Sequence, residues 1–145
     1  MTRLRRDMKI SSIMTKKVTT VDMDISLGAI CGIFEDKKFH HLLVVEDDEL
    51  RGVISDRDVL KALSPFLNTP SEQGKDLTTL RKRSHQIMSR KPTTITEDAS
   101  AKDAIRLMFQ KNISCLPVIS SDGQIEGIVT RKDLLHAYSQ QVDAD

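Results

Sequence analysis

Hydrophobic and polar residues follow one order along the chain, and that order occurs twice. Each half starts with a short β-branched run, at residues 18–21 and 93–95, which predicts a strand. Apolar residues at helical spacing come next and predict an amphipathic helix. They are Leu27, Ile30 and Phe34 in the first half and Ala104, Ile105 and Met108 in the second. Ser26 and Ser100 precede these helices and are typical N-cap residues.

A second strand, a turn, a third strand and a second helix complete each half. The apolar runs LLVV (residues 42–45) and LPVI (residues 116–119) predict buried strands, and the polar turns EDDE and SSDG follow them. The third strand passes through Gly52 or Gly127 and leads into the predicted helices DRDVLKAL and RKDLLHAY. Each half therefore has the predicted order β-α-β-β-α, which makes the fold class mixed α/β, in the α+β sense.

The two halves are an internal repeat, because they align in order with one extra residue near Gly123. The predicted parts are an N-terminal segment (1–12), a first repeat (13–63), a linker (64–86), a second repeat (87–138) and a C-terminal tail (139–145). A repeat of about fifty residues is marginal as an independent folding unit, so we expect the two to share a core about a pseudo-two-fold axis. The linker is predicted to be helical around residues 76–83.

Composition narrows the class of protein. The chain has 145 residues, of which 30% are charged and 39% hydrophobic, as is ordinary for a globular protein. With 22 basic and 21 acidic residues, the net charge of +1 favours neither nucleic acid nor an anionic membrane. No apolar stretch has the length of a signal peptide or a membrane span, so we expect a cytoplasmic protein. Cys31 and Cys115 lie far apart in apolar segments and are predicted to be buried free thiols of a reducing compartment.

One motif carries the candidate chemistry. GVISDRD (residues 52–58) and GIVTRKD (residues 127–133) each place an aspartate three positions after a hydroxyl residue. These pairs are Ser55 with Asp58 and Thr130 with Asp133. The spacing fits a helix capping box, and it also fits a ribose site, because two adjacent sugar hydroxyls can donate to one carboxylate. Spacing alone favours capping, since Ser100 and Asp103 have the same spacing at another predicted helix start.

In this order the repeats resemble the cystathionine beta-synthase (CBS) domain family, whose tandem copies form a Bateman module. The resemblance covers nearly the whole chain and is carried by LPVI, by the two motifs above, and by IM followed by TT in each half. The latter residues are Ile13-Met14, Thr19-Thr20, Ile87-Met88 and Thr93-Thr94. The first half departs from the pattern at Leu43, which is aligned with Pro117.

The resemblance implies a non-enzymatic sensor with no obligatory cofactor. Its ligand is expected to contain adenosine, as AMP, ADP, ATP or S-adenosylmethionine, and to bind in clefts between the repeats. Homodimers are frequent in the family, and an unidentified effector protein is a further expected partner. The resemblance favours ribose binding by Ser55, Asp58, Thr130 and Asp133, and both roles can coexist at a helix N-terminus.

Adenine and phosphate contacts are predicted around the same motifs. Thr20, Val21, Thr94 and Ile95 are candidates for the adenine wall, with Val44 and Val118 behind it. We expect Thr20-Val21 to serve with Thr130-Asp133, and Thr94-Ile95 with Ser55-Asp58. Phosphate candidates are His40, His41, Arg57, Arg131 and Lys132. The histidines align with Ser114 and Cys115, so the two sites differ in charge, and phosphate affinity at the first should depend on pH near neutrality. Solvent-exposed polar residues are the alternative for all five.

Other functions find little support in the sequence. No CxxC, HxxxH or HExxH spacing occurs, which argues against a metal site. There is no Gly-rich phosphate loop or nucleophile elbow, so no enzyme is predicted. The main alternative is a dimerisation or protein-interaction module whose clefts bind no nucleotide. Recognition of RNA or DNA would need a local basic face, for which RLRR (residues 3–6) and RKRS (residues 81–84) are the candidates.

Overall fold

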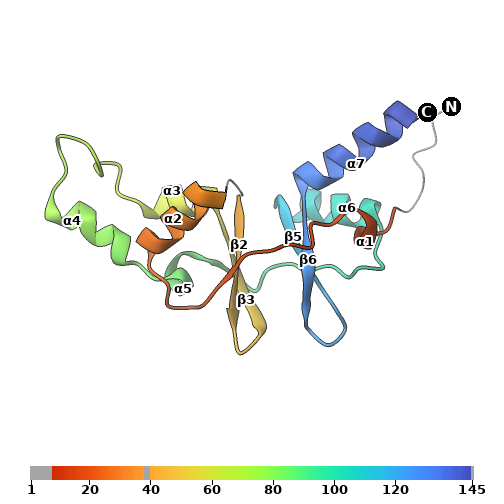
Figure 1. The fold of residues 1–145 in the computed structure, drawn as a ribbon, viewed down its shortest axis with the longest axis horizontal. Helices are drawn as coiled ribbons and strands as arrows, with labels where there is room; N and C mark the ends of the chain where they lie inside the picture. The colour runs from red at the N-terminus through yellow and green to blue at the C-terminus, as the bar shows by residue number, and fades with distance from the viewer. Residues whose placement is uncertain (1–7, 38–39, 145) are drawn as a thin grey trace. The chain divides into compact units, whose positions relative to one another are not determined.

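The computed structural model describes residues 8–37 and 40–144 and contains two compact units (Figure 1). One unit consists of residues 19–92 and is called the middle unit below. The other combines residues up to 18 with residues from 93 onwards and is called the terminal unit. Each unit therefore contains most of one repeat together with the N-terminal segment of the other.

The middle unit is built on a four-stranded sheet. Its strands, in the spatial order β1-β2-β3-β4, are β1 (Thr20–Val21), β2 (His41–Glu46), β3 (Glu49–Ser55) and β4 (Ser89–Arg90). Its helices are α2 (Leu27–Lys37), α3 (Asp56–Ala62), α4 (Gly74–Leu77), the 3-10 helix η1 (Thr78–Arg81) and α5 (Ser84–Ile87). β1 runs parallel to β2, and the other neighbours are antiparallel. Its hydrophobic core contains Val21, Leu27, Ile30, Leu42, Val44, Ile54, Val59, Ala62 and Met88.

The terminal unit repeats this plan in reduced form. Its elements are α1 (Ile10–Ile13), α6 (Ala101–Lys111), β5 (Cys115–Ile119), β6 (Ile125–Thr130) and α7 (Arg131–Ala144). Single bridges flank the β5-β6 pair, with Ile95 parallel to Val118 and Thr15 antiparallel to Ile128. Its core contains Ile10, Ile95, Ala101, Ala104, Met108, Leu116, Val118, Val129 and Leu134. The predicted mixed α/β class with two β-α-β-β-α repeats is confirmed.

The predicted strand at residues 93–95 is an exception, because only Ile95 bridges to β5. In the middle unit the backbone N–H of Leu43 donates to the carbonyl of Thr19, 3.1 Å away, and helps to hold β1 in the sheet. The aligned residue of β5 is Pro117, which has no N–H to donate. The sequence difference between Leu43 and Pro117 thus explains the shorter strand in the terminal unit.

The helices mostly follow their predicted caps and faces. Ser26 and Ser100 accept hydrogen bonds from the backbone N–H groups three residues on, which confirms both N-caps. Ile105 was expected on the buried face of α6 but is 42% exposed. The prediction for Ile105 was wrong, because the buried face of α6 consists of Ala101, Ala104 and Met108 and Ile105 lies beside that face.

The linker is helical, as predicted, over α4 and η1. Asp76 is buried there and accepts hydrogen bonds from the Ser64 hydroxyl and the Gln73 backbone N–H, both at 2.7 Å. The hydrogen bond from Ser64 has the largest effect on the pKa of Asp76, and together with the bond from Gln73 it holds that pKa below its usual value. This buried polar contact therefore joins α4 to the start of the linker, directly after α3.

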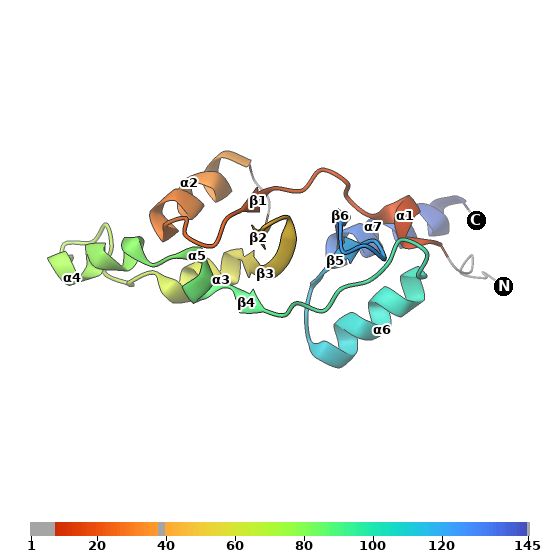
Figure 2. The same cartoon turned by 90° about the horizontal axis from the view of Figure 1, so that it is seen from below.

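The segment just before each repeat packs on the other repeat through a single antiparallel bridge, between Lys9 and Ser100 in the terminal unit and between Arg83 and Ser26 in the middle unit. Figure 2 shows α1 beside the segment that leads into α6. In the terminal unit, Ile10 N–H donates to Ala99 O and Ala101 N–H to Met8 O, at 2.9 and 2.7 Å. In the middle unit, the same contact joins α5 to the loop after β1. There Ser84 N–H donates to Ile25 O and Leu27 N–H to Lys82 O, at 2.9 and 2.7 Å.

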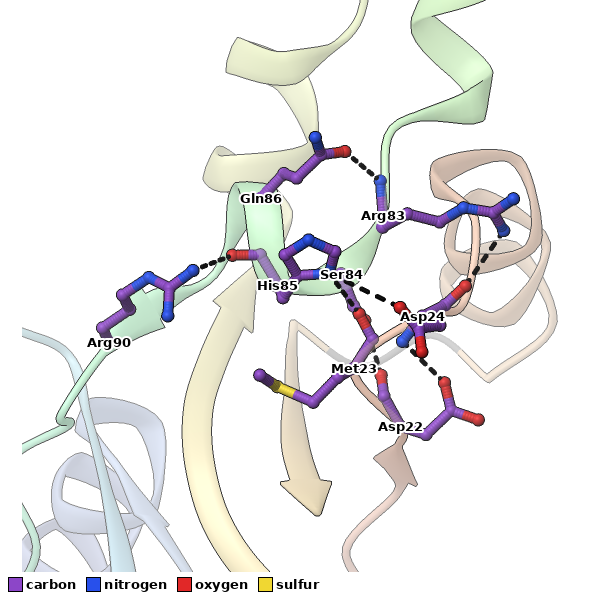
Figure 3. A network of polar contacts seen from close by, with 8 residues as sticks. All are labelled: Asp22, Met23, Asp24, Arg83, Ser84, His85, Gln86 and Arg90. Carbon is purple, nitrogen blue, oxygen red and sulfur yellow. Dashed lines mark hydrogen bonds and ion pairs between the residues drawn. The ribbon is translucent and has the colours of Figure 1, made fainter.

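Side-chain contacts reinforce the α5 attachment (Figure 3). The buried Ser84 hydroxyl donates to the carbonyl of Asp22, and the His85 ring contacts the Met23 carbonyl at 2.7 Å. Arg83 donates from Nη1 to the carbonyl of Asp24, 3.0 Å away. The linker end and the first repeat are therefore joined mainly through backbone carbonyls.

Gly52 in β3 and Gly127 in β6 lie under the backbone that crosses each sheet. These crossing segments are residues 88–89 over Gly52 and residues 14–16 over Gly127. A Cβ at Gly52 would lie 2.5 Å from Met88 Sδ and 2.8 Å from Ser89 O. A Cβ at Gly127 would lie 2.6 Å from the Thr15 carbonyl oxygen. The glycine that opens each repeated motif is thus required by the close approach of a backbone.

Candidate functional site

The candidate site begins at the junctions between β3 and α3 and between β6 and α7. At the first junction, Asp58 Oδ2 accepts from the backbone N–H of Ser55 at 2.8 Å and from its hydroxyl at 3.0 Å. The Asp58 N–H donates back to Ser55 Oγ at 3.1 Å, which completes a capping box. Within the described residues, Asp58 Oδ1 has no hydrogen-bond partner.

The second junction has the same box and one contact more. Asp133 Oδ2 accepts from the Thr130 N–H at 2.9 Å and from the Thr130 hydroxyl at 3.0 Å. Its other oxygen, Oδ1, accepts from the hydroxyl of Thr15 at 3.1 Å. The two predicted ribose carboxylates are therefore held alike through Oδ2 and differently through Oδ1.

Capping is thus a structural fact at both junctions, as the spacing predicted. It does not mark a ligand site, because Ser100 and Asp103 form the same reciprocal pair at the start of α6, with both bonds at 3.1 Å. Hydrogen bonds from Ser100 lower the pKa of Asp103. Ser55, Asp58, Thr130 and Asp133 are all half-buried, so their polar groups remain within reach of a ligand.

Asp58 also lines an open cavity of about 330 Å³ within the middle unit. The other lining residues are Lys61, Ala62, Lys82, Gln86 and Ile87. Lys82 Nζ donates to the carbonyl of Ala62 at 2.9 Å, which places its charge at the C-terminal end of α3. The cavity volume is near the lower limit for small-molecule sites, and the two lysines in its lining favour an anionic group.

The adenine candidates divide into buried and accessible residues. Val21, Val44, Ile95 and Val118 are core residues, so a direct contact with a base would involve their backbone or need rearrangement. Thr20 is exposed and Thr94 half-buried, at the N-terminal side of these core positions. Among these candidates the threonines are therefore the accessible residues, and the four aliphatic side chains are buried.

The phosphate candidates lie close to the helix starts. His40 Nδ1 and Asp56 Oδ2 form an exposed ion pair at 2.9 Å when the ring is protonated. His41 is half-buried, and burial lowers its pKa despite the opposing charges of Asp56 and Asp58. Arg57, Arg131 and Lys132 are exposed and form no ion pair with any described residue.

Cys115 occupies the position that aligns with His41. Both cysteines are free, Cys115 buried and Cys31 half-buried, so the expected burial is confirmed only for Cys115. Burial, helped by the charge of Asp133, raises the pKa of Cys115 to about 12. The terminal unit thus has a neutral thiol where the middle unit has an imidazole.

Two kinds of site residue were missed in the sequence. Thr15 contacts Asp133 from 118 residues away, and Ser89 is its aligned counterpart in the second repeat. A hydroxyl residue directly after IM in both repeats was a signal available in the alignment. Lys61 and Lys82 were missed because their position at the cavity depends on packing between α3 and the linker.

Two negative findings concern only the part of the chain that the structure describes. Residues 8–37 and 40–144 contain no cluster of three or more His, Cys, Asp or Glu side chains able to hold a metal ion. Across the same ranges, none of the helices combines the length and the apolar character that a membrane crossing requires.

The fold and the repeated capping junctions define a protein of two tandem β-α-β-β-α repeats. Comparison with known proteins gives the family, since the model of the CBS domain matches residues 10–65 and 84–140. The chain belongs to the CBS domain family, and the resemblance seen in its motifs is confirmed.

Similar proteins include a relative by sequence and two solved structures of CBS proteins. A CBS domain-containing protein of Dictyostelium discoideum is 35% identical over 128 residues, which are 87% of this chain and 88% of that protein. A solved CBS domain pair in complex with methylthioadenosine and S-adenosylmethionine matches with TM-score 0.77 and 25% identity, covering 93% of this chain and 98% of that one. CBSX2 in complex with AMP matches with TM-score 0.74 and 27% identity, covering 91% and 96%.

Other relatives are longer proteins. For five of them the chain matches 22% to 43% of their length. One of these is a homoserine O-acetyltransferase, of which the matched part is 22%. Domains of this family therefore occur both in short proteins and as parts of longer ones, including an enzyme.

Proposed function

We propose that the chain is a non-enzymatic regulatory module that binds an adenosine-containing ligand at its strand-to-helix junctions. The observation that carries the proposal is the Asp58 carboxylate, whose Oδ1 has no partner among the described residues and which borders a cavity with two lysines. The two similar CBS domain pairs with bound AMP or S-adenosylmethionine support an adenosine ligand.

Each candidate residue has a role in this proposal. Asp58 and Asp133 are the two candidate acceptors for ribose hydroxyls, while Ser55 and Thr130 hold those carboxylates in place. Thr20 and Thr94 border the base, with Val21, Val44, Ile95 and Val118 behind them. His40, His41, Arg57, Arg131 and Lys132 supply cationic or hydrogen-bonding groups for phosphates, and Lys61 and Lys82 add to that charge in the middle unit. A ligand with different affinities for two arrangements of the chain would shift their populations, which is the basis of regulation.

Isothermal titration with AMP, ADP, ATP and S-adenosylmethionine tests the proposal. The variants are Asp58→Asn and Asp133→Asn, with Asp103→Asn as the matched control, because Asp103 caps α6 in the same geometry. We expect saturable binding that is weakened at least tenfold in one or both of the first two variants and retained in the third. Absence of binding to the wild-type chain by all four ligands would refute the proposal and favour a protein-interaction module.

We propose further that the chain self-associates and transmits its state to an effector protein in the cytoplasm. Apolar side chains are exposed on three helices, with Leu60 72%, Phe109 88% and Leu135 66% exposed. Leu60 and Leu135 are aligned in the two repeats, so the same apolar position is present on α3 and α7. Light scattering after size-exclusion chromatography should give a dimer mass, and Leu60→Lys with Leu135→Lys should give the monomer mass. A monomeric wild-type chain would exclude this part of the proposal.

A further inference from the structure

The two ribose carboxylates differ in how many hydrogen bonds they can still accept. A carboxylate has about four lone-pair sites, two on each oxygen. In Asp58, Oδ2 accepts two bonds from Ser55 and Oδ1 accepts none from the described residues. In Asp133, Oδ2 accepts two bonds from Thr130 and Oδ1 accepts a third from Thr15. Asp58 thus has two sites left and Asp133 has one.

This difference matters for a ribose, because its 2′- and 3′-hydroxyls each donate one hydrogen bond. Asp58 can accept both without losing a protein contact. Asp133 can accept both only if Thr15 turns its hydroxyl away, and that exchange replaces one hydrogen bond by another with little net gain. Thr15 lies in the segment whose backbone is fixed to Ile128 by two hydrogen bonds, of 2.8 and 2.9 Å. The threonine is therefore held beside the carboxylate.

The charges around the two carboxylates also make Asp58 the better candidate for binding a nucleotide. Asp58 shares its cavity with Lys61 and Lys82, which favour a phosphate. In the middle unit β2 begins at His41. In the terminal unit the equivalent strand, β5, begins at Cys115, a buried neutral thiol. A phosphorylated ribose is thus better matched by the surroundings of Asp58.

We infer that the Asp58 site of the middle unit is the one that takes the nucleotide, and that Thr15 keeps the Asp133 site closed to a ribose diol by occupying its carboxylate. The inference rests on the proposed function and assigns its ligand to one of two similar sites. It also gives Thr15 a specific role as a residue that positions Asp133 and competes with a sugar hydroxyl.

Titration calorimetry with AMP, ATP and S-adenosylmethionine as probes tests this assignment through stoichiometry. For the probe that binds most tightly, we expect one equivalent per chain and a loss of at least tenfold in affinity for Asp58→Asn. The 2′-deoxy form of AMP or ATP should bind the wild-type chain more weakly than the parent nucleotide. Thr15→Ala should add a second equivalent, and Asp133→Asn in the Thr15→Ala background should remove it. Ser89→Ala is the matched control, since Ser89 aligns with Thr15 but donates no hydrogen bond to Asp58 among the described residues, and it should leave one equivalent.

The outcomes separate this inference from the proposed function. Two equivalents in the wild-type chain, or loss of binding in Asp133→Asn with binding retained in Asp58→Asn, would overturn the inference and leave the proposed function standing. An unchanged stoichiometry in Thr15→Ala would overturn the role given to Thr15. If no probe binds the wild-type chain, both the proposed function and the inference fail. Circular dichroism of each variant checks that the fold is intact.

Discussion

Replacing Gly127 with alanine tests whether the close approach of the Thr15 backbone requires glycine at the start of the motif. The added Cβ would lie 2.6 Å from the Thr15 carbonyl oxygen, whereas ordinary contacts begin at 3.4 Å. The segment would have to move by about 0.8 Å, the difference between those distances, against its two hydrogen bonds to Ile128. Such overpacking costs about 1–3 kcal/mol. We therefore expect the free energy of unfolding to fall by about 2 kcal/mol.

Urea denaturation followed by circular dichroism measures this change. With a denaturant slope of about 2 kcal/mol/M, the midpoint should fall by about 1 M. Gly32→Ala is the matched control, because its Cβ would meet no atom within 4 Å and Gly32 lies inside α2. Alanine there should stabilise the chain by up to about 1 kcal/mol. The reasoning is refuted if Gly127→Ala is as stable as the wild-type chain.

Three further predictions concern buried polar groups and the cysteines. Ser84→Ala should cost about 1 kcal/mol in the same denaturation assay, because it removes the buried bond to the Asp22 carbonyl; a neutral result would contradict that. Because the pKa of folded Asp76 is lowered, its contribution is present above the unfolded pKa of about 3.9 and is lost as pH falls. Unfolding midpoints measured from pH 7 to pH 2 should therefore fall less steeply for Asp76→Asn, and parallel curves would count against it. Iodoacetamide at pH 8 should modify Cys31 before Cys115, since a thiol with a pKa of about 12 is about one part in ten thousand thiolate; mass spectrometry of peptides showing the reverse order would disprove it.

Local patterns were sufficient to predict most of the secondary structure. The strands that contain LLVV and LPVI form from continuous apolar runs, and the helices that follow the motifs form behind a hydroxyl N-cap residue. Two of the four-residue helices, α1 and α5, were not predicted, because four residues are too few to show a helical period. Leu43 was noted as a departure from the pattern that Pro117 follows, but the effect of this difference on the strand at Ile95 depends on a hydrogen bond between distant segments.

The exchange of N-terminal segments between the repeats could not be predicted from either repeat alone. Ile10 and Ser84 occupy aligned positions and are both fully buried, yet one is apolar and the other polar. The apolar residue packs in the core of the terminal unit, and the serine satisfies a backbone carbonyl in the middle unit. The sequence shows that Ile10 and Ser84 occupy equivalent positions. Their contacts depend on the unit in which each segment packs, and neither repeat shows this by itself.

The chemistry of the candidate site shows the same limit. Three capping boxes, at Ser55, Ser100 and Thr130, have nearly the same distances, so a hydroxyl and a carboxylate three residues apart predict a helix start and nothing more. What distinguishes them is the carboxylate oxygen that the cap does not use. In Asp133 that oxygen accepts a hydrogen bond from Thr15, whereas in Asp58, a residue that lines a cavity with two lysines, it accepts none from the described residues. A ligand site in a repeated fold is therefore better judged by the acceptors that remain after the cap has formed than by the motif that forms the cap.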